Sequence, residues 1–146
     1  MEIVIDANVF LNVKNKEEPF YSYSEEVLNS VDEGRNKALL STVVVAEICC
    51  GYYLTGETKD KDDFILHVSS SQNFSIIDLN TLIADQAAYV RSKTGMKLPD
   101  AIIVATAMVE KANRIITNDK DSFKKAAKLA KIQTSKEFVM STEFGK

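Results

Sequence analysis

The sequence predicts an α/β fold, a three-layer α/β/α sandwich with a central parallel sheet of about four or five strands. Short, wholly apolar segments alternate with amphipathic segments of helical periodicity, a pattern typical of a parallel sheet covered by helices on both faces. A length of 146 residues suits one domain with a sizeable core. Because the sequence contains no linker and no internal repeat, we expect a single domain over residues 1–146.

The predicted strands are the short apolar segments. They are residues 3–5, 38–40, 74–79 and 114–117, followed by a short edge strand at 132–134. The predicted helices lie between them. They are residues 22–33, 42–54, 58–71, 81–93, 99–111 and 119–130. Residues 138–144 are either a last turn or a docking tail.

Cap and stop residues define the ends of several of these helices. Ser41 and Thr42 are good N-caps for the second helix, and Gly34 and Gly95 are stop signals. Pro99 fits the first turn of a helix, where its missing N–H costs nothing. The helix that begins there is apolar nearly all round, so we expect it to be central and buried.

Composition and charge exclude several classes of protein. A formal charge of −3 gives no overall support for a nucleic-acid binder that relies on phosphate contacts alone. Phosphates would then have to be handled through bound cations and a local patch. No apolar run approaches the roughly 18 residues of a membrane span, and the N-terminus lacks the basic region of a signal peptide. We therefore expect a cytoplasmic protein without a membrane partner.

Two residue types that often carry chemistry are expected to be structural here. Cys49 and Cys50 are adjacent in a predicted helix, cannot form an ordinary bridge with each other and lack zinc-ligand spacing, so we expect small core residues. His67 is the only histidine and lies in a polar helix, where a surface position is expected. Metal-free ribonucleases of the two-histidine type need an acid and a base, so that mechanism is excluded.

Four acidic residues stand beside or inside apolar segments. They are Asp6, Glu47, Asp100 and Asp119. A carboxylate in such a place is costly unless it is paired or bound to a cation. Taken singly, Asp6 suits a strand-end turn, and Asp100 and Asp119 suit helix caps. Glu47, inside an otherwise apolar helix, has no capping role.

These four side chains are expected to meet at one edge of the sheet. Asp6 and Asp119 follow strands, and ligands of parallel sheets bind outside the carboxyl ends of strands. Asp100 lies in a first helical turn, where the helix dipole favours an anion. If the helix of Glu47 begins at the same edge, all four converge. An all-oxygen ligand set suits Mg²⁺ or Mn²⁺ and disfavours zinc, and one or two such ions can activate water for phosphodiester hydrolysis.

The order of four motifs resembles that of the PIN-domain ribonucleases, and most closely the VapC-like toxins of type II toxin–antitoxin systems. The motifs are VIDANV at 4–9, STVVVAE at 41–47, LPDAIIVATA at 98–107 and IITNDKDSF at 115–123. Each motif alone is unspecific, whereas the four in this order are more specific. The resemblance covers nearly the whole chain.

The resemblance implies roles for individual residues. The four acids match the family quartet that holds Mg²⁺ or Mn²⁺. Thr117 matches the hydroxyl residue that supports this site, and Asn8 stands where the family often has a small polar group. Asp121 is either an auxiliary acid or a helix cap. Lys97, three residues before Asp100, and Lys120, directly after Asp119, are candidates for contacts to RNA.

The resemblance also implies a substrate and partners: single-stranded or looped RNA, an antitoxin protein and a second copy of the chain. The predicted self-association surface is the end of the Glu47 helix, with Tyr52, Tyr53 and Leu54. We therefore expect a metal-dependent endoribonuclease that acts as the toxin of a toxin–antitoxin pair.

Three alternatives stay open. In the first alternative, the chain is an RNA-processing nuclease that is not a toxin. In the second, it is a PIN-like module that binds RNA or a partner without cutting. Such a module usually lacks one or more acids, and all four are present. A phosphatase with Asp6 as nucleophile would want a second Asp two residues later, where this chain has Asn8.

Overall fold

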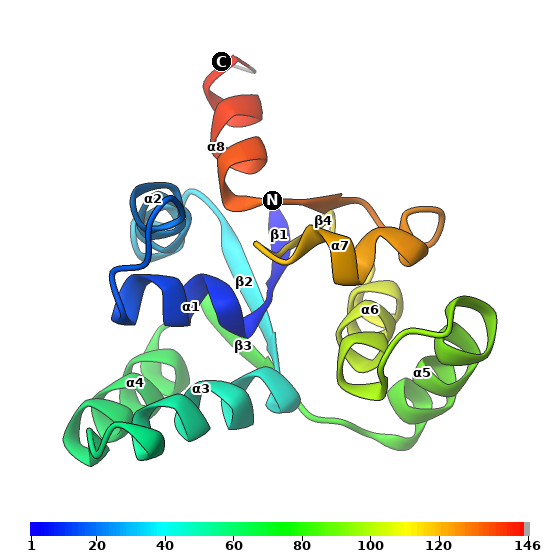
Figure 1. Cartoon of the computed structure of the whole chain (residues 1–146), viewed down its shortest axis with the longest axis horizontal. Coiled ribbons are helices and arrows are strands. Elements are labelled where there is room, and N and C mark those ends of the chain that lie inside the picture. The colour runs from blue at the N-terminus through cyan, green and yellow to red at the C-terminus, as the bar shows by residue number, and fades with distance from the viewer. Residues whose placement is uncertain (145–146) are drawn as a thin grey trace.

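A five-stranded parallel sheet forms the centre of the molecule in the computed structural model, which describes residues 1–144 (Figure 1). The strand order is β3-β2-β1-β4-β5. The strands are β1 (Glu2–Ile5), β2 (Lys37–Ser41), β3 (Phe74–Ile77), β4 (Arg114–Ile116) and β5 (Ile132–Gln133). The predicted parallel sheet is confirmed, with β5 as its short edge strand.

The strand β1 occupies the middle of the sheet. Its Ile3 pairs with Ala38 of β2 on one side and with Arg114 of β4 on the other. Ile3 to Ile5 are fully buried, because helices cover both faces, which explains the unbroken apolar sequence of the strand. All strands run the same way, so the residues that follow β1, β2 and β4 emerge at one edge.

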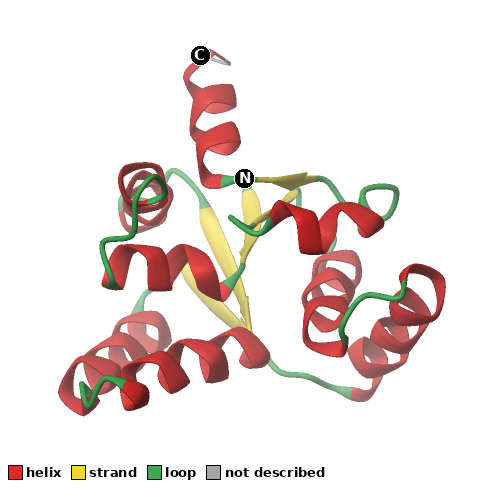
Figure 2. Ribbon diagram, in the orientation of Figure 1, coloured by secondary structure: helices red, strands yellow, loops and turns green. Residues whose placement is uncertain are grey.

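Helices cover both faces of the sheet. They are α1 (Ala7–Lys14), α2 (Tyr21–Asp32), α3 (Thr42–Leu54), α4 (Thr58–Ser70), α5 (Thr81–Thr94), α6 (Leu98–Glu110), α7 (Lys120–Phe123), a 3₁₀ turn (Lys124–Ala126) and α8 (Ser135–Phe144). Figure 1 shows α1, α2 and α4 on one side of the sheet and α5 and α6 on the other. The yellow strands between the two groups of red helices in Figure 2 make the three layers visible. The predicted α/β/α sandwich is therefore confirmed.

The helix α6 is the central buried helix that its sequence predicts. Pro99 stands in its first turn, and every residue from Ala101 to Ala107 is buried. The helix α3 differs. Of its 13 residues only Val44 and Ile48 are buried, so its apolar sequence marks an exposed apolar face rather than a place in the core.

This exposed face overturns two expectations. Cys50 is exposed and Cys49 half-buried, so neither is the core residue that the sequence suggested. Glu47 is also exposed to solvent, so it does not lie inside a buried apolar helix as its sequence neighbours suggested. The expected surface position of His67 is confirmed; its ring lies 2.8 Å from a carboxylate oxygen of Asp32.

Three segments depart from the predicted elements. Residues 7–14 form α1, which was not predicted. Residues 120–126 form only a four-residue helix and a 3₁₀ turn, not a helix to Ala130. Residues 135–144 form α8, which packs against α2. No helix within residues 1–144 has the length and apolarity needed to cross a membrane. Residues 145–146 of the predicted single domain lie outside the described range.

Candidate metal centre

Asp6 is the most buried acid of the chain's described part, and it stands where β1 becomes α1. Its backbone N–H donates to the carbonyl oxygen of Ile116 at 2.9 Å, which extends the β1–β4 pairing past the strand end. Its carboxylate accepts hydrogen bonds from the N–H of Ala7 and the hydroxyl of Thr117, both at 2.8 Å, and from the amide of Asn8 at 2.9 Å. Three donors therefore fix the orientation of this carboxylate.

Burial raises the pKa of Asp6 to about 6. The hydrogen bonds from Thr117 and Ala7 lower the pKa, and repulsion from Asp100 and Asp119 adds to the rise. A buried carboxyl group with a raised pKa and like charges beside it is a frequent feature of functional sites.

Glu47 and Asp100 belong to the same cluster of charges. Desolvation, followed by repulsion from Asp6 and Asp100, raises the pKa of Glu47 to about 7. Because much of Glu47 is open to solvent, water screens part of this repulsion. Desolvation and the charge of Asp119 raise the pKa of Asp100, whereas nearby Lys97 lowers it.

Four separate elements bring these acids together. Asp6 follows β1 and caps α1, Glu47 lies in the second turn of α3, Asp100 in the first turn of α6, and Asp119 after β4 as the cap of α7. The negative charges of Asp100 and Asp119 raise the pKa of Asp6, those of Asp6 and Asp100 raise the pKa of Glu47, and that of Asp119 raises the pKa of Asp100. The acids thus gather at the carboxyl edge of the sheet, where parallel sheets bind ligands.

The chemistry of this cluster fits Mg²⁺ or Mn²⁺, because every side-chain donor is a carboxylate oxygen. As placed, however, no three His, Cys, Asp or Glu side chains within residues 1–144 are close enough to hold one ion together. The carboxylate of Asp119 faces the start of α7, where it accepts a 2.7 Å hydrogen bond from the hydroxyl of Ser122.

Asn8 and Thr117 form a second layer behind Asp6. The Asn8 amide donates to Asp6 and, at 3.1 Å, to the hydroxyl oxygen of Thr117. The carbonyl oxygen of Asn8 accepts from the backbone N–H of Asn118 at 2.9 Å, and the Thr117 hydroxyl accepts from the N–H of Asp119 at 3.2 Å. Two acids that lie far apart in the chain, Asp6 and Asp119, are therefore held by one hydrogen-bond network.

The outer part of this network was not predicted from the sequence. The side-chain amide of Asn118 donates to Asn12 of α1 and Ser24 of α2, both at 2.8 Å, and its carbonyl oxygen accepts from the N–H of Ser135 at 3.0 Å. Asn12, Ser24 and Ser135 are buried. Polar residues at core-facing positions of amphipathic segments could have indicated this network, because buried polar groups need hydrogen-bond partners.

Of the three remaining predicted site residues, only one lies close enough to an acid of the cluster to affect its pKa. Lys97 precedes α6, is exposed and lies close enough to Asp100 to affect its pKa. Lys120 is paired with Glu137 of α8 at 2.7 Å. Asp121 is exposed in the first turn of α7, and the structure does not bring it into the charge cluster.

Comparison with known families decides what this arrangement belongs to. The family model of the PIN domain matches residues 3–129. The chain belongs to the PIN-domain family. The resemblance seen in the sequence is therefore confirmed at the level of the family. PIN domains are typically nucleases and generally use divalent metals.

Several solved structures share the fold of this PIN domain. VapBC2 of Rickettsia felis bound to a promoter DNA fragment has 18% identity and a TM-score of 0.70, over 92% of this chain and 98% of that chain. FitAcB of Neisseria gonorrhoeae has 23% identity and a TM-score of 0.67, over 91% and 97%. DNA-bound VapBC of Salmonella typhimurium has 16% identity and a TM-score of 0.69, over 92% and 98%. No protein of curated function matches the chain in a sequence comparison.

Proposed function

We propose that this PIN domain is a Mg²⁺- or Mn²⁺-dependent endoribonuclease that serves as the toxin of a toxin–antitoxin pair. The observation that carries the proposal is the gathering of four carboxylates at the carboxyl edge of the sheet, where Asp100 and Asp119 repel the buried Asp6, and Asp6 and Asp100 repel Glu47. A cluster of like charges without a functional role would only destabilise the fold. Membership of a family of typical nucleases supports the same conclusion.

The residues of the site divide the chemistry between them. Asp6, Glu47, Asp100 and Asp119 would hold the ion. When bound, such an ion lowers the pKa of a water nucleophile and neutralises charge that develops on the phosphate. Thr117 and Asn8 orient Asp6. Lys97 offers an exposed cation beside Asp100 for a neighbouring phosphate, which matters because the chain has a formal charge of −3 and little general attraction for RNA.

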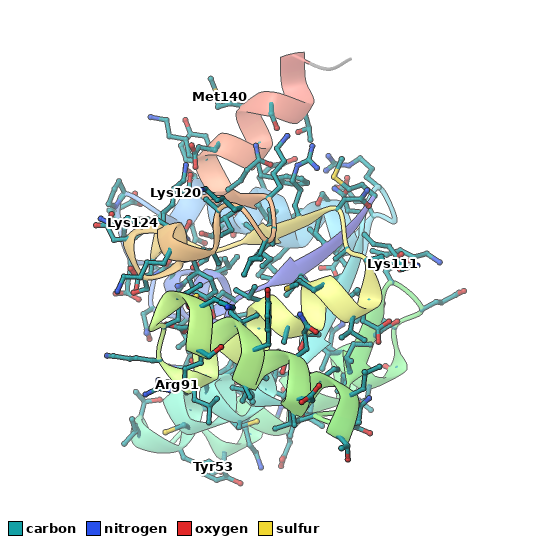
Figure 3. All side chains as sticks on the ribbon, turned by 90° about the vertical axis from the view of Figure 1, so that its right-hand side faces the viewer. Tyr53, Arg91, Lys111, Lys120, Lys124 and Met140 are labelled. Atoms are coloured by element: carbon teal, nitrogen blue, oxygen red, sulfur yellow. The ribbon has the colours of Figure 1, made fainter. Side chains whose placement is uncertain are left out.

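The proposed partners are an antitoxin protein and a second copy of the chain. Solved structures with this fold include a toxin–antitoxin complex from Klebsiella pneumoniae, which supports an antitoxin. For self-association we propose the exposed end of α3, where Tyr53 is 58% and Leu54 82% exposed. Figure 3 shows Tyr53 at the outer surface of the molecule. A protein that cuts cellular RNA would act in the cytoplasm.

The test of the activity is cleavage of a long single-stranded RNA with Mn²⁺, with Mg²⁺ and with chelator. We expect cleavage only with metal, with 5′-phosphate and 3′-hydroxyl ends, as attack by metal-activated water requires. Asp100→Asn should abolish it. Asp85→Asn, an exposed acid on α5, is the matched control and should cut as wild type does. Products with 2′,3′-cyclic phosphate would overturn the mechanism, and failure to cut any RNA would favour a binding module.

The toxin role needs a test in cells. Induced expression of the wild-type chain should arrest growth, and expression of Asp100→Asn should not. Where a small reading frame adjoins the gene, its co-expression should relieve the arrest if it encodes the antitoxin. RNA cleavage in vitro without growth arrest would instead assign the chain to RNA processing.

A further inference from the structure

A hollow of about 220 Å³ opens beside the acidic edge, between the N-terminal ends of α2 and α8. Two aromatic rings line it, those of Phe20 and Tyr23, together with Lys136. Asn118, which directly precedes Asp119, forms another part of its wall. The hollow is therefore connected to the acidic site through adjacent residues of the chain.

The aromatic rings of the hollow differ in their surroundings. Tyr23 packs against the core, and the ammonium group of Lys136 lies 5.9 Å from the centre of its ring. Phe20, by contrast, is 38% exposed at the position directly before α2. The hollow thus presents one anchored ring, one accessible ring and one cation.

Hydrogen bonds hold the wall of the hollow to a residue next to the acidic site in the chain. Thr134 and Glu137 cap the start of α8 reciprocally, at 3.0 and 3.1 Å. Glu137 is paired with Lys120, directly after Asp119, at 2.7 Å. In Figure 3 the labelled Lys120 lies under the first turns of α8. The distance between the hollow and the acids is therefore set by the fold before any ligand binds.

We propose that this hollow binds a nucleobase of the RNA, one that flanks the scissile phosphate. The proposal rests on the ribonuclease function proposed above. Single-stranded RNA is recognised mainly by stacking of splayed bases on aromatic rings and by cations beside the backbone, and Phe20, Tyr23 and Lys136 supply both. The volume lies below the roughly 300 to 1,000 Å³ of pockets for drug-sized ligands, which suits one planar ring system rather than a larger ligand.

The binding experiment separates base from backbone. In the Asp100→Asn background with Mn²⁺, a labelled oligouridylate is compared with an abasic ribose–phosphate oligomer of equal length. We expect Phe20→Ala to weaken binding of the oligouridylate by between about 5-fold and 150-fold, the effect of one lost stacking contact, and to leave binding of the abasic oligomer unchanged. Phe20→Leu, which keeps apolar bulk without a π-face, should also weaken it.

The matched control is Tyr21→Ala. Tyr21 is the next residue and also aromatic, but it does not line the hollow and instead donates to Glu25 at 2.9 Å. This variant should bind both oligomers as the parent does. Equal binding of the oligouridylate by the parent and Phe20→Ala overturns the proposal, as does an equal loss for both oligomers, which would mark a backbone contact.

The cleavage experiment keeps this proposal distinct from the proposed function. With Mn²⁺, Phe20→Ala should raise KM for RNA and leave kcat within about twofold, as expected for loss of uniform binding. Wild-type cleavage with an unchanged Phe20→Ala variant overturns the base site alone. A wild type that binds bases through Phe20 but cuts no RNA overturns the nuclease alone. If Phe20→Ala affects only neutralisation by a co-expressed antitoxin, the hollow belongs to that partner and the base site is wrong.

Discussion

The hydroxyl of Thr117 donates a 2.8 Å hydrogen bond to Oδ2 of Asp6, although the two residues stand 111 positions apart in the chain. Both are buried, and Thr117 is fully so. The contact exists because β1 and β4 are neighbours in the parallel sheet and each residue directly follows its strand. The same hydroxyl accepts from Asn8 and from the N–H of Asp119, so it links two of the acids.

Replacing Thr117 therefore tests how far the position of Asp6 matters. Thr117→Val keeps the shape but leaves two donors and one buried carboxylate oxygen without this partner. We expect unfolding free energy to fall by about 1–3 kcal/mol and RNA cleavage to fall by about tenfold or more, the scale of misplaced catalytic groups. Thr117→Ser keeps the hydroxyl and should restore most of both. Thermal melting and kcat measurements would show this, and an active Thr117→Val would rule out a positioning role.

The sequence predicted the sheet and most helices because these depend on local patterns. A continuous apolar segment such as residues 3–5 has few alternatives to a buried strand, and Ser41 and Gly95 mark helix ends by local geometry. The helix α1 was missed because Asp6 was considered only as a metal ligand or a strand-end turn residue, and not as the N-cap of a following helix. The segment after Asp119 was predicted too long, because lysine-rich helical spacing does not reveal whether the chain packs well enough to continue.

The acidic site was predictable in its members but not in its environment. Strand ends and helix starts at one sheet edge place four carboxylates near one another. Glu47 was selected on the premise that its helix is buried, and this premise is wrong, since only Val44 and Ile48 of α3 are buried. The network through Asn118 depends on contacts among α1, α2 and α8. Pairing of residues distant in sequence leaves no local pattern to recognise.

Removing single charges from the cluster should separate repulsion from structural support. No hydrogen bond to the side chain of Glu47 or Asp100 is found among the described residues, so Glu47→Gln and Asp100→Asn break no hydrogen bond, and Asp100→Asn loses only the attraction of the exposed Lys97. In the metal-free state, the free energy of unfolding of each variant should equal that of the wild type or exceed it by up to about 1 kcal/mol after solvent screening. Asp6→Asn should instead destabilise by about 1–3 kcal/mol, because its amide would face the donors of Asn8 and Thr117.

Metal binding gives these variants a second readout. Ligand binding to the folded state adds RT ln(1 + [L]/Kd) to stability. Saturating Mn²⁺ should therefore raise the melting temperature of wild type more than that of Glu47→Gln or Asp100→Asn. Equal shifts in all three proteins would mean that neither residue contributes to the metal site.

The raised pKa values predict how stability depends on pH in the metal-free protein. Folding raises the pKa of Asp6 from 3.8 to about 6 and that of Glu47 from 4.5 to about 7. Between the unfolded and folded values the native state binds more protons than the unfolded state, so its stability falls as pH rises. Urea unfolding should thus show higher stability near pH 5 than near pH 7.5. A steady increase from pH 5 to 7.5 would contradict this.

Other glutamates with shifted pKa values do not contribute to this pH dependence, and one variant tests whether the acidic cluster causes it. Glu57 and Glu137 have lowered pKa values, Glu57 through hydrogen bonds from Thr55 and Lys14 and Glu137 through Lys120. Their contribution is lost only as pH falls below the ordinary Glu range, so it does not enter the window above it. Asp100→Asn removes one repelling charge and should flatten the dependence between pH 5 and 7.5.

The exposed end of α3 predicts the state of association. Leu54 is 82% exposed, so Leu54→Lys should leave the stability of the monomer unchanged within about 0.5 kcal/mol. In a two-fold dimer, however, two lysines would be buried without partners, which is costly. We expect wild type to sediment as a dimer at roughly tens of micromolar and Leu54→Lys to sediment as a monomer. Leu66→Lys, at a 67% exposed leucine of the neighbouring helix α4, is the matched control and should remain dimeric. A monomeric wild type, or a dimeric Leu54→Lys, would show that this face of α3 serves something other than self-association.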